Sequence, residues 1–173
     1  MKKTATVYWL LPAKPERDLF CEVVRILRKE FRAPNFEPHL TLFSTAKERQ
    51  SPKKVLQQIS LRRIRLTSRG AAFSSEFTKA LFVRFKSTPA LRRLVADLNR
   101  ATKSRAKAPG NPHMSLLYKK LPGSVKKQLA AVMKLPFRTV VFDSIVAVRC
   151  ASPSRTSADV AGWKIVAKRS LRR

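Results

Sequence analysis

The hydrophobic positions of the first half of the chain predict strands and helices in alternation. Residues 5–11 form a β-rich run that ends at a proline. Over residues 16–31 apolar side chains recur every three or four positions, which is typical of a helix with one buried face. Further along, the pattern predicts a strand at 39–43, a helix from Ser51-Pro52 to Ile59 and a strand at 61–68.

The second half predicts the same order of elements. These are a strand at 80–85, a helix that starts at Thr88-Pro89, a strand at 113–118, a helix at 122–134 and strands at 137–150 and 160–169. When the sequence is aligned with itself at an offset of 74 residues, Pro15 matches Pro89 and Trp9 matches Val83. We interpret this as an internal duplication within a single domain, 1–173, with strand–helix–strand lobes at about 5–70 and 79–150 and a final strand at 160–169. Two such lobes are expected to be related by an approximate two-fold axis, with the two copies of one strand face to face.

The two histidines of the chain occupy the same sequence frame. His39 lies in PHLTLF, and His113 lies in PHMSLLY. Alternate residues of a strand share a face, so His39 should point the same way as Thr41, and His113 the same way as Ser115. The apolar residues between them would face the core. Either motif alone would favour a structural histidine, but together they predict two imidazoles and two hydroxyls around one point.

This set of side chains suits phosphate ester chemistry. Imidazole titrates near neutral pH, so one ring can act as a general base while the other is protonated and acts as a general acid. The hydroxyl groups can donate hydrogen bonds to phosphate oxygens, and this mechanism requires no metal and no cofactor.

The charge of the chain favours a phosphate-rich partner. Lys and Arg total 38 against 10 Asp and Glu, which gives a net charge of +28. Lys103, Arg105 and Lys107 lie just before the second histidine motif, and the chain ends in KRSLRR. The basic residues before the second motif could instead form a solvated loop, and the net charge could serve only to keep the protein soluble. We favour nucleotide or RNA, since so large an excess of one sign is costly through self-repulsion.

Several function classes are excluded by what the sequence lacks. Cys21 and Cys150 form neither a disulfide framework nor a metal-binding spacing. The sequence has no Walker A loop, no GxGxxG after a strand, no HExxH and no CxxC pair. The N-terminal apolar run ends at Pro12 and is too short for a signal peptide or a membrane span. We therefore expect a reduced, cytoplasmic, monomeric protein without membrane partners.

The segments YWLLP, FEPHLTLF and PHMSLLY together resemble the 2H phosphoesterase superfamily, and in particular its cyclic phosphodiesterase branch. The likeness covers nearly the whole chain. It implies an α+β, bilobal fold with a central cleft between antiparallel sheets, and metal-independent opening of a ribose cyclic phosphate. The implied substrates are nucleoside 2′,3′-cyclic phosphates or ADP-ribose 1″,2″-cyclic phosphate. The active-site roles fall on the residues that match the two motifs, His39, Thr41, His113 and Ser115.

Three further residues are candidates for the site. The resemblance suggests that Tyr118 reaches the phosphate, yet five positions from His113 a regular strand points it to the opposite face, unless the strand ends or bulges first. Trp9 is expected either to stack on a base or sugar or to be ordinary core. Phe77, placed at the start of a strand, is the third candidate for lining the cleft.

Three functions remain open from the sequence. The first is a cyclic phosphodiesterase, in which we assign His113 as the base and His39 as the acid, although the duplication itself does not distinguish them. The second is an RNA-end processing enzyme that resembles the 2′-5′ RNA ligase branch. The third is a non-catalytic RNA-binding module, which would explain the charge but not the pair of intact motifs.

Overall fold

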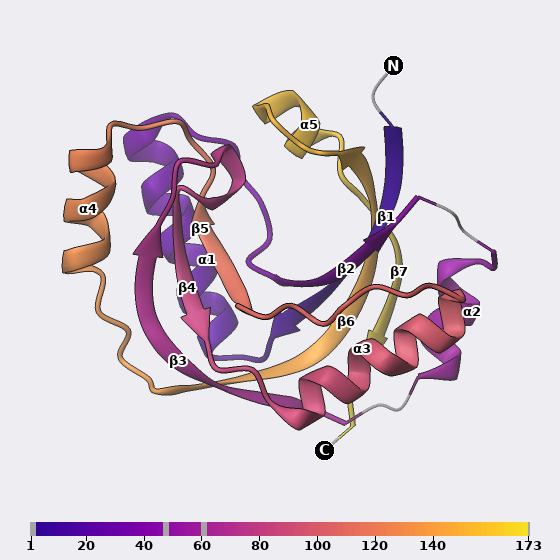
Figure 1. The fold of residues 1–173 in the computed structure, drawn as a ribbon. Coiled ribbons are helices and arrows are strands. Elements are labelled where there is room, and N and C mark those ends of the chain that lie inside the picture. Colours follow the sequence, from indigo (N-terminus) through magenta and orange to yellow (C-terminus); the bar gives the residue numbers. More distant parts are fainter. Residues whose placement is uncertain (1–2, 47–48, 60–61, 173) are drawn as a thin grey trace.

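The computed structural model describes residues 3–46, 49–59 and 62–172 and shows a mixture of helices and antiparallel strands (Figure 1). The strands are β1 (Lys3–Pro12), β2 (Leu40–Thr45), β3 (Ile64–Phe73), β4 (Leu81–Phe85), β5 (His113–Leu117), β6 (Thr139–Ser152) and β7 (Lys164–Ser170). The helices are α1 (Glu16–Phe31), α2 (Pro52–Gln58), α3 (Pro89–Thr102), α4 (Gly123–Val132) and α5 (Ser157–Ala161), with a 3-10 turn η1 (Phe77–Lys79).

The strands form one antiparallel sheet that closes on itself. Its order is β1-β2-β5-β4-β3-β6-β7, and β1 also pairs with β6. The long strand β6 joins the two halves, because its first residues pair with β3 and the rest pairs with β1. On the other side, β2 and β5 meet through the single pair Leu40 and Met114. This arrangement confirms the predicted α+β fold with antiparallel sheets.

The two sequence repeats exchange their third strands. β3 follows the first histidine motif in the chain but pairs with β4 of the second repeat, and β6 pairs with β1 of the first. The spatial halves are therefore β2-β1-β6-β7 and β5-β4-β3, and they differ from the sequence segments 5–70 and 79–150. The two histidine strands also meet edge to edge and not face to face, because β2 and β5 are neighbours in one sheet.

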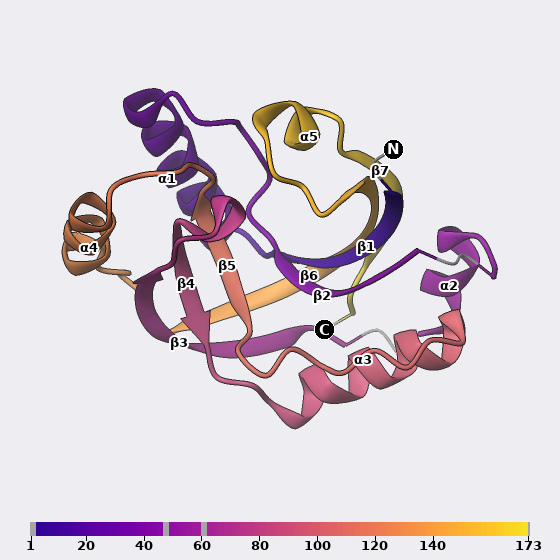
Figure 2. The same ribbon diagram turned by 45° about the horizontal axis from the view of Figure 1, so that its top comes forward.

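The helices cover the sheet in two pairs, as both views show (Figures 1 and 2). α1 and α4 pack against β5 and β3, and α2 packs against β7 and α3. The amphipathic stripes predict these contacts: α1 buries Phe20, Val24 and Leu27. The predicted N-caps are also present, since the side chains of Ser51 and Thr88 accept hydrogen bonds from backbone N–H groups at the starts of α2 and α3.

The sequence pattern places the start of the last strand too early. A short helix, α5, occupies 157–161, and β7 begins only at Lys164. The helix forms because Thr156 and Asp159 make a capping box, in which each side chain accepts a hydrogen bond from the backbone of the other residue. Both cysteines are free thiols. No helix within the described residues is long and apolar enough to span a membrane.

Candidate active site

Both histidine strands carry a bulge directly after the hydroxyl residue of the motif. On β2, Thr41 pairs with Trp9 while Phe43 pairs with Tyr8, so that Leu42 is the extra residue. On β5, Ser115 pairs with Phe82 while Leu117 pairs with Leu81, so that Leu116 is the extra residue. Each bulge adds one residue to its strand and thereby reverses the alternation of side chains beyond it.

The bulges bring a third side chain of each motif into the site. Leu116 and Leu117 are both buried in the core, and Tyr118 turns to the face of Ser115 and lines the cavity. The bulge that Tyr118 requires in order to reach the cleft is therefore present. The same shift on β2 directs Ser44, 74 positions before Tyr118, into the cavity. Ser44 was missed in the sequence because a hydroxyl residue in a strand is common and its face depends on the bulge.

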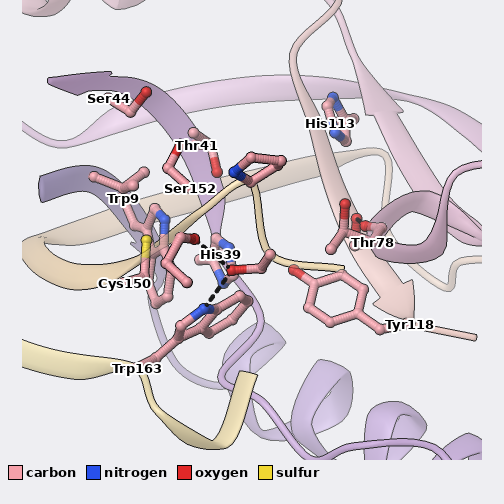
Figure 3. Close-up of a pocket in the computed structure, with 15 residues that line it drawn as sticks. Trp9, His39, Thr41, Ser44, Thr78, His113, Tyr118, Cys150, Ser152 and Trp163 are labelled. Atoms are coloured by element: carbon pink, nitrogen blue, oxygen red, sulfur yellow. Dashed lines mark hydrogen bonds between the residues drawn. The ribbon is translucent and has the colours of Figure 1, made fainter. Parts of the chain in front are cut away.

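The two motifs line one cavity of about 250 Å³ (Figure 3). β2 contributes His39, Thr41 and Ser44, and β5 contributes His113 and Ser115. In Figure 3, His113 lies across the cavity from Ser44 and Trp9. Further lining residues, which the sequence did not single out, come from the other strands, the turn before β4 and the β6–β7 connection: Val7, Thr78, Cys150, Ala151, Ser152, Pro153, Ser154 and Trp163. The structure thus brings together the four motif residues that the sequence selected.

Each imidazole is oriented by a backbone carbonyl two residues earlier in the chain. His39 Nδ1 lies 2.6 Å from the oxygen of Glu37, and His113 Nδ1 lies 3.1 Å from the oxygen of Asn111. A carbonyl can only accept, so Nδ1 must carry the hydrogen in both rings. In each ring Nε2 remains as the atom for proton transfer, an acceptor when the ring is neutral and a donor when it is protonated.

The two imidazoles have unequal surroundings. Burial is the main reason that the pKa of His39 is lowered to about 4; the charge of His113 acts in the same direction, and the hydrogen bond to the Glu37 carbonyl opposes both. His113 is half-buried; desolvation lowers its pKa too, as does the charge of Lys79, while the contact with Asn111 and the charge of Glu76 act in the opposite direction. His39 is therefore the ring held neutral near pH 7, and His113 is the one more easily protonated.

Trp9 supports His39 at the wall of the cavity. Its ring stacks on the imidazole with centroids 3.6 Å apart and planes 12° apart. Trp163 meets both rings edge-on, and its Nε1 donates to the Ser154 hydroxyl at 2.9 Å. Trp9 is among the residues that line the cavity, as expected, although only 4% of it is exposed.

Tyr118 is held as a neutral phenol beside Ser115. Burial raises its pKa, and this effect outweighs the hydrogen bond with Ser115, which lowers the pKa. The Ser115 hydroxyl donates to the carbonyl of Thr78 at 2.7 Å. Phe77 lies in η1, not in a strand, and its ring contacts Tyr118 with centroids 6.2 Å apart. It packs behind Tyr118 and does not line the cavity.

The three basic candidates lie outside this cavity. Lys103 and Arg105 line a neighbouring hollow that shares Ser44 with it, and Lys107 is exposed but lines neither. Within the described residues, no three His, Cys, Asp or Glu side chains cluster in a way that could hold a metal ion.

Comparison with known proteins identifies the family. A family model described as the 2′-5′ RNA ligase superfamily matches residues 22–151. The chain belongs to this superfamily. It is 27% identical over 133 residues to a cyclic phosphodiesterase from Arabidopsis thaliana, with 73% of this chain and 72% of the plant protein covered. The predictions of a 2H phosphoesterase and of an enzyme are thereby confirmed.

Two solved structures are similar to this chain over nearly their full length. Escherichia coli LigT in complex with 3′-AMP has a TM-score of 0.56 at 12% identity, with 99% of this chain and 100% of LigT covered. TT0787 of Thermus thermophilus has a TM-score of 0.59 at 18% identity, with 97% of this chain and 98% of that protein covered. At these identities the likeness concerns the fold.

The stacking of Trp9 on His39 predicts a fluorescence titration. Both tryptophans of the chain contact His39, and a protonated imidazole quenches indole emission. We expect emission to fall as the pH is lowered through about 4, the pKa of His39. The substitution His39→Gln should abolish this step, and Trp9→Leu should move it upward toward the ordinary value of 6.5 by exposing the ring. An unchanged titration in folded His39→Gln would show that another group causes the step.

Proposed function

We propose that the protein hydrolyses a ribose cyclic phosphate to a monophosphate, with the two histidines as acid and base and without a metal ion. The observation that carries this proposal is the pair of imidazoles, each with Nδ1 fixed on a carbonyl, that line one cavity together with Thr41 and Ser115. The two rings differ in burial, which gives them different protonation states in the same pH range.

In this mechanism His39 is the base and His113 the acid, the reverse of the roles that we assigned from the sequence. Neutral His39 takes a proton from water at Nε2, and the water oxygen bonds to phosphorus. The bond from phosphorus to one ribose oxygen breaks, and His113 gives its Nε2 proton to that oxygen. The reversal follows from burial, since the more deeply buried imidazole is the one that is neutral.

The hydroxyl groups of the cavity stabilise the phosphate. Thr41 is exposed to the cavity and can donate to a non-bridging oxygen. Ser115 can do so once its hydroxyl rotates away from the Thr78 carbonyl, and Tyr118 retains its proton because burial raises its pKa. Donors placed before the reaction stabilise the charge that develops on these oxygens.

The relatives support this assignment at the level of the reaction class. The plant relative is named a cyclic phosphodiesterase, and LigT has been solved with 3′-AMP, a ribose monophosphate of the kind such a reaction would release. A purely RNA-binding role would leave both oriented imidazoles without a purpose. The cytoplasmic location and the monomeric state stay predictions.

Replacement of either histidine tests the assignment. His39→Ala and His113→Ala should each lower kcat/KM for a nucleoside 2′,3′-cyclic phosphate by roughly two to four orders of magnitude. Thr41→Ala and Ser115→Ala each remove one donor and leave the acid and the base in place, so they should cost less, about ten- to a hundredfold. Circular dichroism and unfolding midpoints control for folding. Near-normal turnover by a folded histidine variant would contradict the mechanism.

The pH profile separates the roles of the two rings. The active form has neutral His39 and protonated His113, so kcat/KM should rise with pH through about 4 and fall at a pH below 6.5, the ordinary histidine value. The residual activity of His39→Ala should lose the acidic limb, and that of His113→Ala the alkaline limb. If His39→Ala instead loses the alkaline limb and His113→Ala loses the acidic limb, then His113 is the base.

Chelation tests whether the site needs an ion. Because the imidazoles supply both proton transfers, exhaustive dialysis against EDTA should leave kcat/KM unchanged. The control is a zinc-dependent hydrolase that loses activity under the same treatment. Loss of activity that one specific metal restores would refute the metal-free mechanism.

A further inference from the structure

One buried charge takes no part in the proposed mechanism. Lys126 lies near the start of α4, and only 7% of it is exposed. A buried ammonium group is costly unless it forms hydrogen bonds. Its Nζ donates to the carbonyl of Ser74, 52 positions earlier in the chain, at 2.7 Å. This charge-assisted bond ties α4 to the segment that joins β3 to β4.

Ser74 closes the turn that contains η1. Its hydroxyl donates to the carbonyl of Lys79 at 2.7 Å and accepts from the N–H of Glu76 at 3.2 Å. The N–H of Lys79 donates to the Glu76 carbonyl at 3.1 Å. Residues 74–79 therefore form one closed unit, which we call the Ser74 turn. The bond from Lys126 attaches this whole unit to α4.

The Ser74 turn borders both motif residues of β5. The carbonyl of Thr78 accepts from Ser115 Oγ at 2.7 Å, and Thr78 lines the cavity on the same side as His113 (Figure 3). Lys79 Nζ lies 4.9 Å from the centroid of the Phe82 ring, and this ring meets His113 edge-on with centroids 5.3 Å apart. A displacement of the turn would therefore change the surroundings of the hydroxyl and of the imidazole together.

The Ser74 turn also holds two opposite charges near His113. Lys79 lowers the pKa of this imidazole and Glu76 raises it, and the effect of Lys79 is the larger. Arg84, its cross-strand partner on β4, and His39, with which its charge interacts, also face His113, and neither belongs to the turn. If the turn moved away, the effect of Lys79 would weaken and the ring would be less desolvated. Both changes raise the pKa of His113.

We propose that Lys126 is a positioning residue for the reaction: it holds the Ser74 turn against β5 and thereby keeps Ser115 and His113 in the arrangement that the mechanism uses. Lys126 does not line the cavity, so it acts through the turn and not on the substrate. The role of His113 as the acid rests on the proposed function, but the titration of its ring can be measured without turnover.

The titration is followed by NMR of the two histidine rings. The chain has only these two histidines, and the spectrum of His39→Gln assigns their signals. Lys126→Met keeps an unbranched side chain of similar length in the buried position and removes the donor. The pKa of His113 should then rise toward the ordinary value of 6.5, and that of His39 should stay at about 4. The matched control is Lys127→Met, which removes the same charge from the exposed neighbouring position and should move neither ring.

Turnover of a nucleoside 2′,3′-cyclic phosphate gives a second readout. Lys126→Met should lower kcat by about ten- to a hundredfold, the range expected when reacting groups are displaced by up to about 1 Å. The alkaline limb of kcat/KM should move to higher pH together with the NMR titration of His113. Lys126→Arg keeps a cationic donor and should recover part of kcat, and Lys127→Met should behave as the wild type.

Ser74→Ala tests the same link from its other end and decides the question if Lys126→Met does not fold. It removes the hydroxyl that closes the turn and leaves the carbonyl that Lys126 binds. The pKa of His113 should rise by a smaller amount than in Lys126→Met. In the double variant the loss of kcat should be smaller than the sum of the two single effects on the free-energy scale, because both act through the same turn. Circular dichroism and unfolding midpoints control for folding.

The outcomes separate the positioning role from the reaction. An unchanged titration of His113 in folded Lys126→Met or, where that variant is unfolded, in Ser74→Ala would overturn the role of Lys126, as would equal effects of Lys126→Met and Lys127→Met. Normal turnover by the wild type with such an unchanged titration would leave the proposed function and refute the positioning role. A shifted titration in a protein that turns over no cyclic phosphate would leave the link from Lys126 to His113 and refute the proposed function.

Discussion

The active site depends on one contact, the pairing of Leu40 with Met114. Both side chains are fully buried, and this is the cross-strand pair through which the described residues of β2 and β5 meet. The two residues are 74 positions apart in the chain, at equivalent places in the two motifs. The register of an antiparallel pair then sets His39 beside Ser115 and Thr41 beside His113. Burial of two apolar residues thus brings the polar ones together.

The bulges turn this alignment into a cavity. A regular strand would direct Phe43 and Leu117 toward the substrate and Ser44 and Tyr118 toward the core. Leu42 and Leu116 take up one extra position each, so that two successive apolar residues enter the core on each strand. The same bulges therefore direct apolar side chains into the core beneath the sheet and polar side chains into the cavity above it.

The chemistry comes from departures from symmetry. Two related motifs with identical surroundings would titrate together, and neither ring would be fixed as base or acid. Trp9 and Trp163 enclose His39 on one side, while His113 lies half-buried near Lys79 and Glu76. The difference in desolvation separates the two pKa values, which is the condition for general acid and base catalysis by a pair of like groups. At the ends of the cavity, Ser44 and Tyr118 break the symmetry again, in size.

The sequence alone determined most of the elements, with the exceptions of η1, α5 and the start of β7, and it showed the shared frame of the two motifs and the resemblance to the family. Apolar periodicity defines α1 and α3 because each buries a single stripe, and the repeated histidine frame is local in the chain. The exchange of β3 and β6 between repeats was not predictable in this way, because strand pairing is decided by distant partners. The same holds for the bulges at Leu42 and Leu116, each of which directly follows the hydroxyl residue of its motif without a glycine to mark it. The place of Trp163 and the unequal burial of His39 and His113 were decided only by tertiary structure, since desolvation is a property of the packed site and not of the residue.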